Sequence, residues 1–128
     1  MTLAAIKELV KKDEWAWNRR DVIKIALSCT HDTEWNIDGK QFLGRLEVIN
    51  FLTTKWLKQF DYKLKKELLS CINNRISLEF EYEYRNEEME WCKEAGLEQW
   101  TLNEAGLISK REIVTKASSS KAFNTSML

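Results

Sequence analysis

The segment from Ile76 to Tyr84 alternates strictly between apolar and polar residues. Its even-numbered positions carry Ile, Leu, Phe, Tyr and Tyr, and its odd-numbered positions carry Ser and three Glu. Because successive side chains of a β-strand point to opposite faces, this alternation predicts a strand with one aromatic face and one charged face. An aromatic strand face has to be covered by another layer of structure, so the rest of the chain must supply that cover.

Helical periodicity is found in the first half of the chain. Apolar residues spaced by three and four predict a first helix from Leu3 to Trp17. Asp21 is a suitable N-cap for a short second helix. A third helix is expected to start just after Gly44 and to run to Phe60, with a broad apolar stripe formed by Leu46, Ile49, Thr53, Trp56, Leu57 and Phe60. These helices are the expected cover for the sheet.

From Tyr62 onward the hydrophobic period changes to two. The strands that we expect are 62–72, 75–85, 90–102 and 107–116, with a short additional strand at 33–36. Asn73 and Asn74 predict a two-residue hairpin turn, because Asn tolerates positive φ. In the simplest register of that hairpin, Lys66 lies opposite Glu81 on the charged, solvated face.

Three helices followed by four long strands predict an α+β fold of the cystatin-like cone type. In this fold the N-terminal helices pack on a curved antiparallel sheet of four main strands plus a short one. The open end of such a cone is a natural site for a small molecule. Residues 117–128 contain little apolar material, and we expect them to form a flexible tail.

Composition excludes several classes of function. The chain has 128 residues, with 20 basic and 20 acidic side chains, so it has no net charge to attract nucleic acid or an anionic membrane. We expect no nucleic-acid partner and no membrane segment, and the N-terminus does not resemble a secretory signal. A cytoplasmic location is therefore expected.

Cysteine and histidine residues do not form a recognisable metal motif. Cys29, Cys71 and Cys92 are odd in number and far apart, which is typical of free thiols in a reducing compartment. His31 follows Cys29 by two residues, but zinc needs three or four convergent ligands. We expect no metal and no cofactor, and we place His31 in a surface loop.

Several segments together resemble the SnoaL-like branch of the nuclear transport factor 2-like superfamily. The residues that carry the resemblance are spread from about residue 16 to residue 112. They are Ala16-Trp17-Asn18, Asp21, Trp35, Gly44-Arg45, Phe51-Leu52, Lys55-Trp56, Asp61-Tyr62, Lys66-Glu67-Leu68, Asn74-Arg75-Ile76, Phe80, Tyr82-Glu83, Trp91, Gly96, Glu98, Trp100, Gly106-Leu107 and Arg111-Glu112.

The resemblance implies a single cone-shaped domain over residues 1–116. It also implies a homodimer formed through the outer sheet face, and a pocket of the kind used by various relatives for isomerisation, cyclisation, dehydration or epoxide hydrolysis. The chain departs from the family pattern at Asn36 to Asp38 and at Lys93, Ala95 and Leu97. These departures replace polar pocket candidates with apolar or oppositely charged residues.

Glu98 is the candidate catalytic residue. It lies between Leu97 and Trp100 on a strand expected near the cavity, and a carboxyl group beside an indole suits a general base or a hydrogen-bond donor. The alternative is a structural ion pair with Arg111 or Lys110 from the adjacent strand, which is the commoner role for such a carboxylate.

The six tryptophans suggest an aromatic pocket, although simple core packing is the alternative for each of them. The residues that we expect to bind a ligand are Trp17, Trp35, Trp56, Tyr82 and Trp100, with Arg111 and Glu112 as secondary candidates.

Two functions from different classes are compatible with these features. The first is a dimeric protein that binds a small apolar ligand, with cofactor-free acid–base chemistry of the isomerase, cyclase or dehydratase type on a carbonyl or alcohol substrate. The second is a non-catalytic interaction or scaffold protein whose pocket is degraded.

Overall fold

A computed structural model describes residues 1–116, so the tail expected at 117–128 lies outside the described residues. The elements in chain order are α1 (Leu3–Asn18), α2 (Val22–Leu27), β1 (Cys29–Ile37), β2 (Lys40–Leu43), α3 (Gly44–Leu57), β3 (Phe60–Ile72), β4 (Arg75–Arg85), β5 (Trp91–Leu102) and β6 (Ile108–Thr115). The three helices and the four long strands therefore lie where the sequence pattern predicts them.

The strands form one six-stranded sheet in the order β2-β1-β6-β5-β4-β3. The meander β3-β4-β5-β6 is antiparallel throughout. In contrast, β1 pairs with β6 in parallel. The expectation of an antiparallel sheet with one short extra strand was therefore incomplete. The segment after Asp38 turns back as β2, because Asp38 and Gly39 both adopt positive φ and so allow a tight hairpin there.

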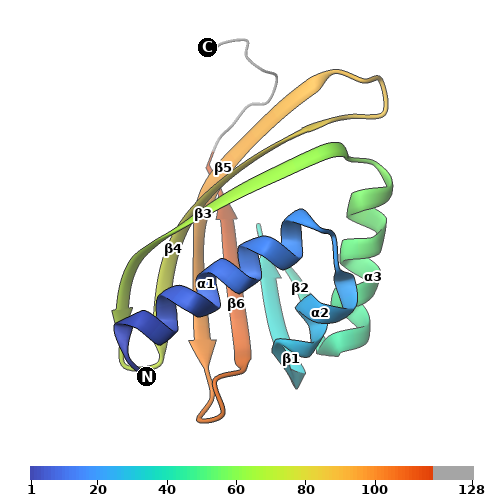
Figure 1. The fold of residues 1–128 in the computed structure, drawn as a ribbon. Helices are drawn as coiled ribbons and strands as arrows, with labels where there is room; N and C mark the ends of the chain where they lie inside the picture. The colour runs from blue at the N-terminus through green and yellow to red at the C-terminus, as the bar shows by residue number, and fades with distance from the viewer. Residues whose placement is uncertain (117–128) are drawn as a thin grey trace.

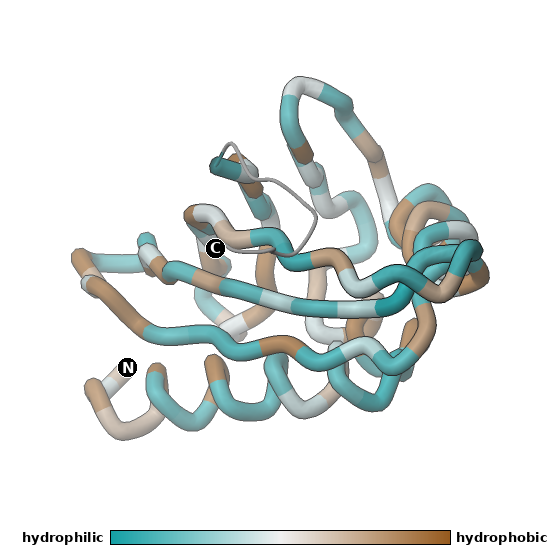
Figure 2. Tube along the Cα trace, turned by 90° about the horizontal axis from the view of Figure 1, so that it is seen from above, coloured by the Kyte–Doolittle hydropathy of each residue, from teal (hydrophilic) through white to brown (hydrophobic). Residues whose placement is uncertain are grey.

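The curved sheet and the helices enclose the core between them (Figure 1). Hydrophobic and hydrophilic residues are mixed along the whole trace, as the hydropathy colouring in Figure 2 shows. Helix α1 runs across the face of the sheet beside β3, and α3 packs against β1. The long third helix is thus not the element that crosses the meander; α1 has that position.

The buried stripe of α3 differs from the one predicted. Val48, Leu52 and Trp56, spaced by four, are buried, whereas Leu46 and Leu57 are 75% and 70% exposed. The sequence offers apolar residues around much of this helix, so tertiary packing decides which stripe faces inward. With this orientation of α3 about its axis, Lys55 also lies on the inner side of the helix.

Helix α1 covers the free edge of β3. The Asn18 side chain accepts a hydrogen bond from the Leu64 amide at 2.7 Å and donates one to the Leu64 carbonyl at 2.9 Å. Glu14 Oε2 accepts a hydrogen bond from the Lys66 amide at 2.7 Å. These side chains satisfy backbone groups that an edge strand would otherwise leave open to pairing with another chain.

A β-bulge in β3 reverses the predicted orientation of Lys66. The turn at Asn73 has the expected positive φ, but the register shifts between Leu68 and Ser70. The extra residue, Leu69, moves the residues from Lys63 to Leu68 by one position. Lys66 therefore lies opposite Phe80 on the inner face, and Lys65 takes the position opposite Glu81. The predicted pairing of Lys66 with Glu81 was wrong.

Within residues 1–116, no helix combines the length and the apolar character needed to span a membrane. The three cysteines are free thiols, and Cys29 is buried.

Candidate functional site

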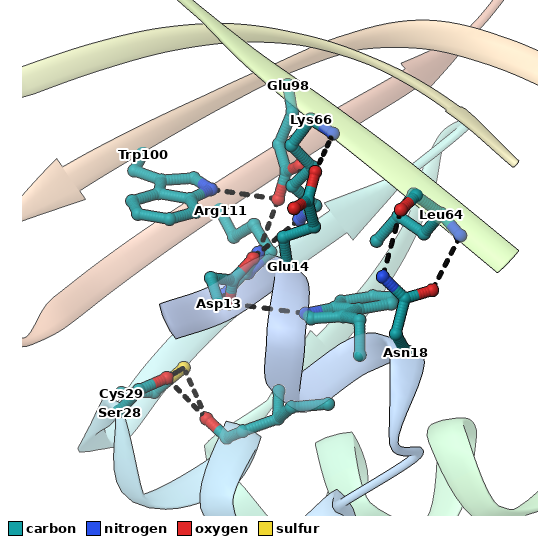
Figure 3. A network of polar contacts seen from close by, with 12 residues as sticks. Asp13, Glu14, Asn18, Ser28, Cys29, Leu64, Lys66, Glu98, Trp100 and Arg111 are labelled. Carbon is teal, nitrogen blue, oxygen red and sulfur yellow. Dashed lines mark hydrogen bonds and ion pairs between the residues drawn. The ribbon is translucent and has the colours of Figure 1, made fainter. Parts of the chain in front are cut away.

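Four charged side chains form a buried cluster between α1 and the sheet (Figure 3). Asp13 comes from α1, Lys66 from β3, Glu98 from β5 and Arg111 from β6, and all four side chains are at most 4% exposed. Lys66 Nζ lies 2.6 Å from Asp13 Oδ2 and 2.8 Å from Glu98 Oε1. Arg111 pairs with Asp13 at 3.1 Å and also with Glu98. Each cation therefore contacts both anions.

Register explains how Glu98 and Arg111 come together. Glu98 and Trp100 are two residues apart on β5, so their side chains share the inner face of the sheet. Arg111 lies directly opposite Trp100 on β6. The Trp100 indole donates a hydrogen bond to Glu98 Oε2 at 2.8 Å, and the same oxygen accepts from Arg111. Both carboxylate oxygens of Glu98 are thus engaged in hydrogen bonds or ion pairs.

Three indole rings surround the cations of this cluster. The Arg111 guanidinium carbon lies 4.6 Å from the centre of the Trp35 ring and 4.9 Å from that of Trp100. Lys66 Nζ lies 4.6 Å from the centre of the Trp17 ring. The negative faces of aromatic rings attract cations, most strongly when water is excluded. The rings therefore stabilise the charges that the ion pairs bring into the core.

The charges of the cluster lower the pKa of Asp13 and raise the pKa of Arg111. Burial alone would raise the pKa of Asp13, but Arg111 and Lys66 outweigh burial and lower that pKa below its usual 3.8. Burial alone would lower the pKa of Arg111, but Asp13 and Glu98 raise it above its ordinary value. Asp13 and Arg111 are thus held in their charged forms.

A cavity of about 190 Å³ opens beside this cluster. Its wall combines aromatic and aliphatic side chains with a few polar groups. The lining residues are Trp17, Ile37, Asp38, Phe51, Lys55, Tyr62, Leu64, Lys66, Phe80, Tyr82, Glu94, Glu98, Ile113 and Thr115. A dry cavity of roughly 150 Å³ is large enough for benzene, so this space suits a molecule built on a single ring.

A second polar group of the cavity consists of Lys55, Tyr82 and Glu94. Lys55 Nζ donates a hydrogen bond to Tyr82 Oη at 3.2 Å, and the Tyr82 hydroxyl donates to Glu94 Oε1 at 2.5 Å. Burial lowers the pKa of Lys55 from its usual 10.5 to about 8, although Glu94 opposes this effect. Burial and the Glu94 charge raise the pKa of Tyr82 above its ordinary value.

The predicted site residues occupy four different places. Trp17, Tyr82 and Glu98 line the cavity. Trp35, Trp100 and Arg111 are fully buried in or around the ionic cluster. Trp56 packs edge-on against Trp17 at 5.5 Å. Glu112 is exposed. Of the two alternatives for Glu98, the contact with Arg111 is present in the structure.

The sequence pattern did not indicate Asp13, Lys55, Tyr62, Lys66 or Glu94 as site residues. Asp13 had a recognisable signal, since it continues the apolar stripe of the first helix three residues after Val10 and four before Trp17. A charged residue on a buried stripe requires a partner. Lys66 had no such signal, because its inward position depends on the bulge at Leu69.

Solved structures with this fold cover most of the chain. SalBIII, an epoxide hydrolase/cyclase-like enzyme with a role in pyran ring formation in the polyether salinomycin, is 16% identical with a TM-score of 0.79, covering 90% of this chain and 93% of that one. TerC, co-crystallised with polyporic acid, is 17% identical with a TM-score of 0.72, covering 83% and 87%.

An NTF2-like protein of unknown function from Burkholderia pseudomallei K96243 is also similar, with 17% identity and a TM-score of 0.74, covering 84% of this chain and 87% of that one. At these identities the likeness concerns the fold, which is the nuclear transport factor 2-like fold that the sequence resemblance implied. A comparison with curated protein sequences finds no match. The sequence matches the DUF1348 family, described as proteins of unknown function, over residues 1–124, and the chain belongs to that family.

Proposed function

We propose that this protein binds a small, largely apolar molecule in the cavity between α1, α3 and the sheet, and that it performs cofactor-free acid–base chemistry on a carbonyl or alcohol group of that molecule. The observation that carries the proposal is the composition of the cavity wall. Aromatic rings from Trp17, Tyr62 and Tyr82 face the same space as the ionisable groups of Lys55 and Glu98. An apolar cavity with a few convergent polar groups is the usual form of a small-molecule site.

Similar proteins support the small-molecule part of the proposal. SalBIII is described as epoxide hydrolase/cyclase-like, and TerC was crystallised with polyporic acid. The fold is thus used for small molecules elsewhere, although one fold hosts many activities. The cavity of this chain favours compounds of about one ring.

Glu98 is the proposed proton carrier of the catalytic function. It is the fully buried carboxylate of the cavity wall, at 2% exposed. Its two carboxylate oxygens form ion pairs with Lys66 and Arg111. Replacing Glu98 with Gln should abolish turnover, while replacing the exposed Glu112 with Gln should preserve it. Unchanged turnover in Glu98→Gln would remove Glu98 from this role.

A thermal-shift screen of single-ring alcohols and ketones tests binding. A ligand at one hundred times its dissociation constant should stabilise the fold by about 2.7 kcal/mol. Ile113 lines the cavity, so Ile113→Phe should fill it and abolish this stabilisation. Val114 is the next residue and is 60% exposed, so Val114→Phe is the control and should retain the stabilisation. A shift that survives Ile113→Phe would place the ligand elsewhere.

A non-catalytic interaction protein is the second candidate function. The observation that favours it is the pairing of both Glu98 oxygens within the buried cluster, which suits a structural role. If the screen finds no ligand, this second function becomes the better explanation.

Association of two copies through the outer sheet face is part of both functions. Leu97 and Val114 are cross-strand neighbours there, at 44% and 60% exposed. The neighbouring acidic row of β4 is partly compensated, because Lys65 lies opposite Glu81 and Lys63 opposite Glu83. Sedimentation equilibrium at neutral pH should therefore give a dimer mass, and a monomer mass would contradict the proposal.

A further inference from the structure

The amino group of Lys55 has different surroundings from that of Lys66, the other lysine of the cavity wall. Lys66, the second lysine of the wall, contacts Asp13 and Glu98 directly. Within residues 1–116, Lys55 has no carboxylate at ion-pair distance, and its hydrogen-bond partner is the hydroxyl of Tyr82. Its Nζ lies 4.4 Å from the centre of the Tyr82 ring and 5.7 Å from that of Tyr62. This amine therefore faces the cavity from an aromatic wall.

Tyr62 provides a second, independent observation that points to a ligand in this cavity. Its side chain lines the cavity, the residue is 7% exposed, and within residues 1–116 its hydroxyl makes no hydrogen bond of full geometry, the interaction with the Trp56 indole being a weak one. A buried hydroxyl without a partner costs free energy, so such groups are usually satisfied by a ligand or by water. A ligand oxygen atom that accepts a hydrogen bond would satisfy Tyr62.

We propose that Lys55 is a nucleophilic amine that forms an imine with a small aldehyde or ketone bound in the cavity. This inference rests on the proposed small-molecule function and names its substrate class. The geometry that carries it is the chain of contacts from Lys55 through Tyr82 to Glu94, together with the buried and weakly bonded Tyr62 hydroxyl in the same cavity.

The chemistry needs no further reagent. The lone pair of the neutral Lys55 amine attacks the carbonyl carbon, and the carbonyl π electrons move to oxygen, which takes up a proton. The nitrogen loses a proton, which gives the carbinolamine. When the carbinolamine hydroxyl is protonated, the nitrogen lone pair forms the C=N bond as the C–O bond breaks and water leaves, and loss of the remaining N–H proton gives the imine. Tyr82, hydrogen-bonded to both Lys55 and Glu94, is placed to pass these protons.

Burial supplies the neutral amine that the first step requires. A lysine in an apolar pocket loses its proton more easily and becomes a nucleophile near neutral pH. The pKa of Lys55, lowered to about 8, agrees with this requirement. Near pH 8 about half of the Lys55 side chains are then neutral.

Reductive trapping of an imine with benzaldehyde tests the proposal. The full chain is incubated with benzaldehyde and sodium cyanoborohydride, which reduces an imine to a stable benzyl amine, and the modified lysines are mapped by peptide mass spectrometry. Lys58, which follows Lys55 by three residues and is exposed, is the internal control. We expect labelling of Lys55 to exceed that of Lys58 roughly tenfold, to increase with pH around 8 and to be slower in Tyr82→Phe.

Benzyl alcohol, which fits the same space but cannot form an imine, separates this inference from the proposed function. If benzyl alcohol raises the melting temperature but benzaldehyde labels Lys55 no faster than Lys58, the imine proposal is wrong and binding stands. If benzyl alcohol gives no shift and Lys55 is not labelled, both proposals fail. Lys55→Met and Lys55→Arg should each lose the label at residue 55 and keep it at the other lysines. The main comparison, Lys55 against Lys58, is made on the wild-type chain, so it does not depend on either variant folding.

Discussion

Lys66 Nζ lies 2.6 Å from Asp13 Oδ2 and 2.8 Å from Glu98 Oε1, so a single buried ammonium group joins the first helix to the fifth strand. Arg111 makes the same two connections from the sixth strand. The cluster thus ties α1 to three strands of the sheet, and the cavity is built directly against it. The position of α1, and with it the shape of the cavity, depends on these ion pairs.

Replacing Lys66 with Met should destabilise the protein strongly. Removing one partner of a buried ion pair leaves the other charges uncompensated and costs about 3 to 5 kcal/mol. Lys65→Met, on the adjacent exposed residue, is the matched control and should change the free energy of unfolding by less than about 0.5 kcal/mol. Urea denaturation at neutral pH measures both. Equal stability of the two variants would show that the buried cluster has no net structural role.

The free energy of unfolding should decrease in acid, because Asp13 becomes protonated there. Its pKa is lowered in the folded state, so its contribution is fully present above the unfolded pKa of about 3.9 and is lost as the pH falls through the folded value. Asp13→Asn should be less stable at neutral pH and should lose less free energy of unfolding between about pH 4 and pH 2. Urea denaturation at a series of pH values tests this, with the exposed Asp32→Asn as control. A slope in Asp13→Asn as steep as that of the wild type would contradict the prediction.

Gly96 should not tolerate a side chain. A Cβ at this position would lie 2.2 Å from the Val114 carbonyl oxygen and 2.8 Å from the Phe80 ring. Phe80 lines the cavity, so relief of the clash would move its ring into the ligand space. Gly96→Ala should therefore lower the free energy of unfolding by about 1 to 3 kcal/mol and weaken ligand stabilisation. Gln99→Ala on the same strand is exposed and should change neither property. Chemical denaturation and thermal shift with a bound alcohol provide the two readouts.

Local patterns of the sequence determined the elements of this fold. The alternation from Ile76 to Tyr84 is β4, the apolar spacing after Leu3 is α1, and Asp21 caps α2 through a 3.1 Å hydrogen bond from the Lys24 amide. Such features depend on neighbours a few residues away, so they can be read from the chain itself. Glu98 and three of the aromatic residues chosen as site candidates, Trp17, Trp35 and Trp100, also lie at or beside the buried cluster, because large aromatic residues concentrate in cores.

Only the tertiary structure decided which charged groups meet and which amine faces the cavity. A single extra residue in β3, Leu69, moved Lys66 from the outer to the inner face, since a strand reverses its side chains at every position. The rotation of α3 turned Lys55 inward, although the sequence predicted a different stripe for that helix. Asp13 and Arg111 are 98 residues apart, and no local pattern links them. Long-range packing brings these groups together, because each buried charge requires a partner that only the folded chain can supply.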